Sequence, residues 1–212
     1  MPGGESASGA GAAGAGSSWD ALRAVLLDPT EAASLDVHGR VDAAVLVPLY
    51  LHEGEIHAVF TQRRDDLRRH AGEISFPGGR RDPGEPDLLA TALRESEEEI
   101  GLPRGAVTII GALQPIPTLA TNYAIYPFVG VIKHGHRWVP SAAEVEAVLE
   151  LSLADLRGGY ARRRIVRRGV PFRTDSYVVG DHLIWGATAR ILGDLLERIE
   201  ATVPALSDRA LT

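Results

Sequence analysis

Residues 76–102 read FPGGRRDPGEPDLLATALRESEEEIGL, a glycine turn followed by a loop and a long amphipathic segment. The turn at Gly78–Gly79 leads into a loop at 82–85, and apolar periodicity then predicts a helix from Leu88 to Ile100. Residues at helical spacing predict its buried stripe: Leu89, Leu93, Ser96 and Ile100. The sequence therefore predicts an α+β chain with one helix near its middle.

The same helix carries three glutamates on another face. Glu95, Glu98 and Glu99 stand at i, i+3 and i+4, and carboxylates this close repel one another unless a cation is present. Hard divalent ions such as Mg2+ prefer oxygen ligands and usually share them with substrate phosphates. Arg94 precedes Glu98 by one turn and can hold that carboxylate. A metal and phosphate site is the favoured interpretation, and a solvated acidic face is the alternative.

The composition limits the remaining possibilities. The 212 residues, 45% apolar and 24% charged, suit one domain, which we place at 18–212 after a low-complexity tail at 1–17. The absence of cysteine excludes disulfides, thiol catalysis and cysteine-based zinc sites. A net charge of −6 argues against general nucleic-acid binding. With no apolar run long enough for a membrane and no signal-peptide pattern, we expect a cytoplasmic monomer or homodimer.

The stretch resembles the signature of the Nudix hydrolases: Gly, five residues, Glu, seven residues, Arg-Glu, apolar, any, Glu-Glu, any, Gly, apolar. The matching residues are Gly79, Glu85, Arg94, Glu95, Glu98, Glu99, Gly101 and Leu102. The chain departs from the signature twice. Eight residues separate Glu85 from Arg94, and Ser96 stands at the apolar position. The extra residue falls where the loop meets the helix, so the role of Glu85 stays open.

The resemblance implies a fold and a chemistry. The fold is an α/β/α sandwich around a mixed β-sheet, and the activity is a pyrophosphohydrolase that depends on Mg2+ or Mn2+ and acts on a small-molecule nucleotide. The implied metal ligands are the carboxylates of Glu95, Glu98 and Glu99 with the backbone carbonyl of Gly78. Glu98 is favoured as the base that takes a proton from water, with Arg94 beside it. Glu144 is the alternative base, because some members place that group on a late loop.

A second resemblance covers residues 61–79, TQRRDDLRRHAGEISFPGG. The coenzyme A pyrophosphatase branch of the Nudix family has the same spacing, matched here by Thr61, Arg63, Arg68, Gly72 and Phe76 to Gly79. The chain departs at Arg64, where the branch has Ser or Ala, and at Val59–Phe60, where it has two leucines. The residues expected to bind substrate are Arg63, Arg68, Gly72, Phe76 and Gly79.

The branch implies coenzyme A as substrate, with 4′-phosphopantetheine and adenosine 3′,5′-bisphosphate as products. Arg63 and Arg68 are the expected partners of the 3′-phosphate, because the planar guanidinium suits phosphate oxygens. Other Nudix substrates remain alternatives: ADP-ribose, a dinucleoside polyphosphate or a nucleoside triphosphate. A nucleotide-binding regulator on a Nudix fold is a further alternative, and the complete set of Arg94 and the three helix glutamates counts against it.

The rest of the chain predicts the surrounding elements. A short helix is expected from Trp19 to Leu27, ended by Asp28–Pro29. The predicted strands and turns are a hairpin of 41–50 with 56–62, strands at 107–113 and 123–132, a loop at 115–121, and an arginine-rich hairpin around Gly169. A final helix is expected from Trp185 to Ile199.

Overall fold

The computed structural model of the chain describes residues 19–66, 72–118, 122–167 and 169–207. At its centre lies the long strand β1, Val41–His52, whose apolar and β-branched residues favour a buried, extended chain. β1 pairs antiparallel with β2, Glu55–Arg63, and parallel with β7, Tyr123–Val131. The central sheet is therefore mixed, as predicted.

Five more strands complete the main sheet around this centre. Its order is β3-β2-β1-β7-β5, with β3 at Ile74–Ser75 and β5 at Thr108–Ala112. Three more strands pair with members of this series without being part of it. They are β4, Gly78–Arg80, beside β1; β6, Ile116–Pro117, beside β7; and β8, Val145–Ser152, beside β2. The pairing of β4 with β1 places the glycine turn directly beside the central strand.

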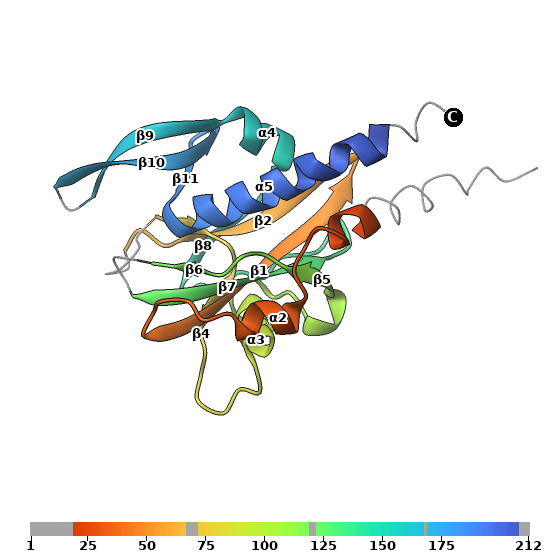
Figure 1. Ribbon diagram of the computed structural model, residues 1–212. Coiled ribbons are helices and arrows are strands. Elements are labelled where there is room, and N and C mark those ends of the chain that lie inside the picture. The colour runs from red at the N-terminus through yellow and green to blue at the C-terminus, as the bar shows by residue number, and fades with distance from the viewer. Residues whose placement is uncertain (1–18, 67–71, 119–121, 168, 208–212) are drawn as a thin grey trace, which may run out of the picture.

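Helices cover both faces of this sheet. In β1 the side chains alternate, so Leu46 packs in the cluster that contains α3, Leu88–Ile100, while Val47 and Leu49 pack in the cluster that contains α5, Gly186–Ser207. Figure 1 shows α3 and α5 on opposite sides of the strands. Each fully buried leucine in these layers contributes on the order of 2 kcal/mol. The expected α/β/α sandwich is confirmed.

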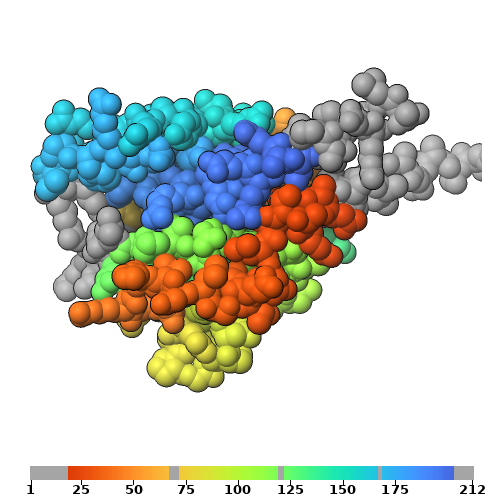
Figure 2. Space-filling model, in the orientation of Figure 1, coloured from red at the N-terminus to blue at the C-terminus, as the bar shows by residue number. Residues whose placement is uncertain are grey.

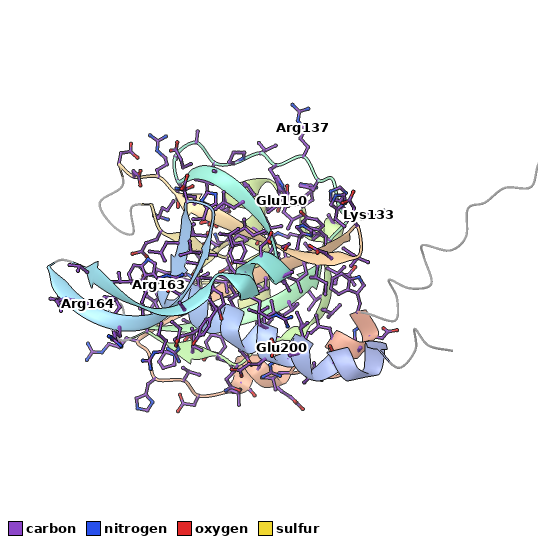
Figure 3. The ribbon with its side chains drawn as sticks, turned by 90° about the horizontal axis from the view of Figure 1, so that it is seen from above. Lys133, Arg137, Glu150, Arg163, Arg164 and Glu200 are labelled. Atoms are coloured by element: carbon purple, nitrogen blue, oxygen red, sulfur yellow. The ribbon has the colours of Figure 1, made fainter. Side chains whose placement is uncertain are left out.

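A second, smaller sheet stands beside the main one. It consists of β9, Tyr160–Arg167, β10, Val170–Val179, and β11, His182–Trp185, in the order β11-β10-β9. α4, Leu153–Gly158, leads into it. The β9–β10 hairpin extends past the body as an arm (Figure 1), and the view from above places Arg164 on this arm, far from Lys133 (Figure 3). The predicted hairpin around Gly169 is confirmed.

The region before β1 differs from the prediction. Residues 19–23 are helical, so the first helix ends well before Leu27. Asp28–Pro29 was expected to end a helix, but it begins α2, Pro29–Ser34. The Asp28 carboxylate accepts a hydrogen bond from the Thr30 N–H at 2.8 Å, and proline needs no N–H partner in a first turn. An Asp-Pro pair can start a helix as well as stop one.

Three further elements, β6, β8 and η1, were missed by the sequence analysis, and one helix was longer than expected. The 115–121 loop contains the short strand β6, and residues 145–152 form β8 because they pair with the edge of β2. A single 3₁₀ turn, η1, spans Arg104–Ala106. The last helix runs to Ser207, beyond the predicted Ile199. Of the helices in the described ranges, none, α5 included, is long and apolar enough to cross a membrane.

Candidate active site

The glycine turn brings the chain unusually close to its neighbours. Gly78 lies opposite Val45 on β1, and a Cβ on Gly78 would stand 2.3 Å from the carbonyl oxygen of Ala44. A Cβ on Gly79 would stand 2.3 Å from Oε1 of Glu95. Only residues without a side chain allow the backbone of β4 and the carboxylate of α3 to approach in this way.

Helix α3 has the predicted bounds but a different buried row. Asp87 caps its start by accepting from the Ala90 N–H at 2.7 Å, and Gly101 ends it in the left-handed region with φ 70°. The buried residues are Leu88, Thr91, Ala92, Ser96, Glu99 and Ile100. The prediction is therefore wrong for Leu89 and Leu93, which are only partly buried. Two adjacent leucines begin the helix, so periodicity alone could not select the row that faces the sheet.

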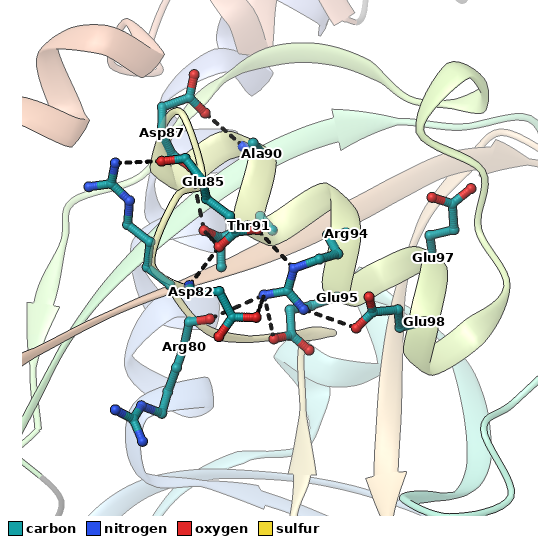
Figure 4. A network of polar contacts seen from close by, with 12 residues as sticks. Arg80, Asp82, Glu85, Asp87, Ala90, Thr91, Arg94, Glu95, Glu97 and Glu98 are labelled. Atoms are coloured by element: carbon teal, nitrogen blue, oxygen red, sulfur yellow. Dashed lines mark hydrogen bonds and ion pairs between the residues drawn. The ribbon is translucent and has the colours of Figure 1, made fainter.

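Arg94 is the centre of a polar network on α3 (Figure 4). Its side chain is only 18% exposed. Nε donates to Glu85 at 2.8 Å, Nη1 donates to Glu98 at 2.9 Å, and Nη2 lies 3.0 Å from Oε1 of Glu95. Nη2 also donates to the carbonyl of Arg80 at 3.2 Å. The predicted contact between Arg94 and Glu98 is confirmed, and the same guanidinium organises two further carboxylates.

Glu85 takes part in this network despite the extra residue before the helix. Its Oε2 accepts from the Asp82 N–H at 2.8 Å and from the Thr91 hydroxyl at 2.7 Å, while Oε1 accepts from Arg94. Hydrogen bonding to Arg94 is the main reason that the pKa of Glu85 falls to about 2. The 81–87 loop stands out from the body in Figures 1 and 2, which gives the inserted residue room. Sequence analysis missed Thr91, although its position one turn before Arg94 places it on the same face.

Glu99 and Glu95 form the buried part of the site. Glu99 is 9% exposed, and its Oε2 accepts from the Gly78 N–H at 3.0 Å. Burial raises the pKa of Glu99 to about 8, and the nearby charges of Glu95 and Glu144 add to the rise. Burial also raises the pKa of Glu95, although Arg94 opposes the shift. The site therefore holds more negative charge than its own cations balance, which favours a bound proton or metal cation.

The three helix carboxylates are less alike than the sequence predicted. Glu95 and Glu99 point toward the glycine turn, whereas the side chain of Glu98 is 59% exposed and is held by Arg94. Helical spacing places the three on neighbouring rows, but the packing of α3 on the sheet buries one row and leaves the next in solvent.

Glu144 joins the site from a distant part of the chain. A register shift in the pairing of β2 with β8 lies next to Arg63, which pairs with Val145. There, Nη1 of Arg63 contacts Oε2 of Glu144 at 3.3 Å. The charge of Glu144 contributes to the raised pKa of both Glu95 and Glu99, so it lies within electrostatic reach of them. Nε of Arg63 is buried and has no hydrogen-bond partner within the described ranges.

The structure places the remaining residues that were expected to bind substrate in different settings. Arg68 lies outside the described residues. Gly72 has φ 67° and donates its N–H to the Arg63 carbonyl at 3.1 Å, so its place is set by a tight turn. The prediction for Phe76 is wrong, because this side chain is 2% exposed and stacks on Phe60 with ring centroids 4.6 Å apart. Phe76 supports the glycine turn from the core and does not face a ligand.

The donors at the site fit a hard divalent cation in kind. They are carboxylate and backbone oxygens around a glycine turn whose close approach a Cβ would prevent. Among the described residues, no three His, Asp or Glu side chains are gathered as a ligand set. The contacts explain this arrangement, because Arg94 holds Glu95 and Glu98 while the Gly78 N–H holds Glu99.

Comparison with known proteins decides the family. The family model described as NUDIX domain matches residues 40–169, which include the central strands, the glycine turn, α3 and Glu144. The chain belongs to the Nudix family. A curated relative from Salmonella paratyphi B, called "Uncharacterized Nudix hydrolase NudL", is 38% identical over 159 residues, which cover 74% of this chain and 82% of the relative.

Solved structures agree on the fold of this Nudix hydrolase. RenU, a Nudix hydrolase from M. Smegmatis, has a TM-score of 0.54 and 16% identity, and the match covers 78% of this chain and 89% of RenU. An Ap4A hydrolase from C. elegans has a TM-score of 0.50 and 19% identity over 77% of this chain and 98% of its own. The family model and the curated relative make the chain a hydrolase that acts on pyrophosphate bonds. Nudix enzymes act on small-molecule nucleotide substrates and generally use divalent metals.

Proposed function

We propose that this Nudix hydrolase cleaves the diphosphate of coenzyme A or its derivatives, releasing 4′-phosphopantetheine and adenosine 3′,5′-bisphosphate. The observation that carries the proposal is the place of Arg63. This arginine belongs to the spacing shared with the coenzyme A branch, and it lies next to the carboxylates with a buried Nε that has no partner in the described part of the chain. A guanidinium there supplies the positive charge that the acidic helix cannot give to a substrate phosphate.

The residues that would hold Mg2+ or Mn2+ are Glu95, Glu98 and Glu99 with the backbone carbonyl of Gly78. A bound divalent cation neutralises phosphate charge and lowers the pKa of a coordinated water. Arg94 keeps the carboxylates of Glu95 and Glu98 within one network, and Glu85 keeps Arg94 in place. Burial raises the pKa of Glu99, so a bound cation would stabilise the charged form of this carboxyl.

Glu144 is the better candidate for the base that accepts the proton of the attacking water. Glu98, which the sequence favoured, is held by Arg94 at 2.9 Å, whereas Glu144, which is similarly exposed, is held less tightly by Arg63 at 3.3 Å. Glu144 comes from the loop before β8, and its charge raises the pKa of both Glu95 and Glu99. Arg63 orients its carboxylate through the 3.3 Å contact. Glu98 then serves as an outer metal ligand.

The 3′-phosphate distinguishes coenzyme A from most related substrates, and Arg63 is its proposed partner within the described residues, with Arg68 as a second partner. A charge-assisted hydrogen bond contributes about 1.5–3 kcal/mol, so coenzyme A should be cleaved roughly ten- to a hundredfold faster, by kcat/KM, than its 3′-dephospho form. Arg63→Ala should remove much of this difference.

A panel assay with Mg2+ tests the proposal. It compares coenzyme A and 3′-dephospho-coenzyme A with ADP-ribose, a dinucleoside polyphosphate and nucleoside triphosphates. Preference for coenzyme A, lost in Arg63→Ala, supports the assignment. Equal kcat/KM for the two forms in the wild type would remove the 3′-phosphate argument, and a higher kcat/KM for another compound would replace the substrate.

A further inference from the structure

We propose that Arg64 is a positioning residue that fixes the loop 139–144 and thereby the carboxylate of Glu144; the catalytic part of this inference rests on the proposed role of Glu144. Arg64 follows the last residue of β2. Its Nη1 donates to the carbonyl of Ala142 at 2.6 Å, and its backbone N–H donates to the carbonyl of Glu144 at 3.1 Å. The side-chain bond connects residues that are 78 positions apart in the sequence.

Asp66 sets the direction of this guanidinium. Nε of Arg64 donates to Oδ1 of Asp66 at 2.9 Å, and Nη2 donates to Oδ2 at 2.8 Å. A planar guanidinium held at two points by one carboxylate has a fixed orientation, which leaves Nη1 directed at the loop. These bonds engage all three nitrogens of the group with protein atoms. Each nitrogen of Arg64 is therefore engaged in a tie within the protein.

The other end of the loop is tied to the helix that carries the carboxylates. Val139 donates its N–H to the carbonyl of Ile100 at 3.0 Å, and Ser141 donates to the carbonyl of Glu99 at 2.8 Å. A Cβ on Gly101 would stand 2.8 Å from Cβ of Val139, so the loop packs closely on the end of α3. The loop thus runs from the backbone of Glu99 to the side chain of Arg64, with Glu144 at its far end.

The other ties at that far end are polar: the backbone bond from Arg64 to Glu144, the contact of Arg63 with the Glu144 carboxylate, and the pairing of Val145 with β2. Ala142, Ala143 and Glu144 are exposed, so apolar burial contributes little to their position. The N–H groups of Glu144 and Val145 both bond to the carbonyl of Ser141 and form a tight turn, which fixes the shape of the loop and not its distance from β2. A short side chain at position 64 could not span to Ala142. The longer arginine therefore adds a tie to the exposed turn at Ala142, which neither the backbone bond to Glu144 nor Arg63 supplies.

Hydrogen exchange of the peptide 141–146 tests the tie without using activity. In Arg64→Ala, amide exchange in this peptide should quicken by about tenfold, since local opening governs exchange in weakly packed segments. Arg64→Lys should give a smaller change, because an ammonium cannot hold Asp66 at two points and reach Ala142 at once. Arg162→Ala is the matched control: Arg162 also faces one aspartate, Asp175, but lies on the arm. Unchanged exchange in Arg64→Ala would overturn the inference, whatever the substrate.

Kinetics test the link to Glu144. Arg64→Ala should lower kcat about ten- to a hundredfold with little change in KM, the usual effect of losing a group that orients a reacting one. In a Glu144→Gln background the same substitution should have almost no further effect on kcat, because the residue that it positions is already inactive. Additive losses would show that Arg64 does not act through Glu144. Faster exchange together with no hydrolysis of any panel compound would remove the proposed function and leave the tie in place.

Discussion

Arg94 on α3 and Arg162 on β9 both face carboxylates, yet their surroundings differ. Arg94 is 18% exposed and contacts Glu85, Glu95 and Glu98 at 3.0 Å or less. Arg162 is 67% exposed and lies 3.6 Å from one carboxylate, that of Asp175. An exposed ion pair contributes about 0–1 kcal/mol, whereas removing one partner of a buried network costs several times more. Arginine therefore organises a partly buried site on α3, whereas on β9 it is a solvated surface residue.

The two regions also differ in charge. Residues 160–179 hold six arginines and one aspartate, a net charge of +5. Since the whole chain carries −6, the other residues together carry −11. On the arm, Arg162 and Arg164 are exposed, so solvent stabilises their charge. The carboxylates around the glycine turn are partly buried and cannot do so, which explains the raised pKa of Glu95 and Glu99. A bound cation at the glycine turn is the natural compensation, and the arm has no comparable need.

The largest effect is expected from the buried carboxylates. Glu95→Gln and Glu99→Gln should each lower turnover by about two to four orders of magnitude. The thermal midpoint without metal should be kept in Glu99→Gln, because burial disfavours the charged form of that carboxyl. Mn2+ should raise the thermal midpoint of the wild type and not that of either variant. Near wild-type turnover at limiting Mg2+ in either variant would refute the ligand assignment.

The next effect separates the base from an outer ligand. Glu144→Gln should lower kcat by about two to three orders of magnitude with KM little changed, and Glu98→Gln should cost about tenfold. Steady-state kinetics at saturating metal compare the two. The opposite ranking would return the role of base to Glu98, as the family resemblance implied.

Lysine substitutions test directly whether Arg94 and Arg162 differ in their contribution to stability. Arg94→Lys should lower the free energy of unfolding by about 2 kcal/mol, since one ammonium cannot replace a fork that reaches three carboxylates. Urea unfolding with unchanged m-values measures the loss. A stability equal to that of the wild type would mean that the network orients catalytic groups without stabilising the fold.

The smallest effect is expected on the arm. Arg162→Lys and Arg162→Ala should each change the free energy of unfolding by less than about 0.5 kcal/mol and leave kcat/KM unchanged. The same urea titrations and assays serve as the measurement. We expect no role for the arm in substrate binding, because it lies on the other side of the main sheet from α3 (Figure 1). A large loss of activity would show that the arm does take part.

Features set by neighbouring residues could be predicted from the sequence. The bounds of α3, the contact of Arg94 with Glu98 and the hairpin around Gly169 all depend on residues within a few positions of one another. The sandwich fold was predicted from the resemblance to the family signature, in which the glycine turn and the acidic helix occur together. Local spacing maps directly onto local geometry, since a helix places i and i+4 side by side whatever surrounds it.

Other features were decided only by tertiary structure. Three features depend on segments that meet only in the folded chain. They are the burial of Leu88 rather than Leu89, the contact of Glu85 with Arg94 despite the inserted residue, and the pairing of β8 with β2. The burial of Glu99 and the tie from Arg64 to Ala142 depend on such segments too. Spacing along the chain carries no measure of distance between remote segments. The sequence determined the chemistry of the site, and packing decided which carboxylate is buried and which loop brings Glu144 to it.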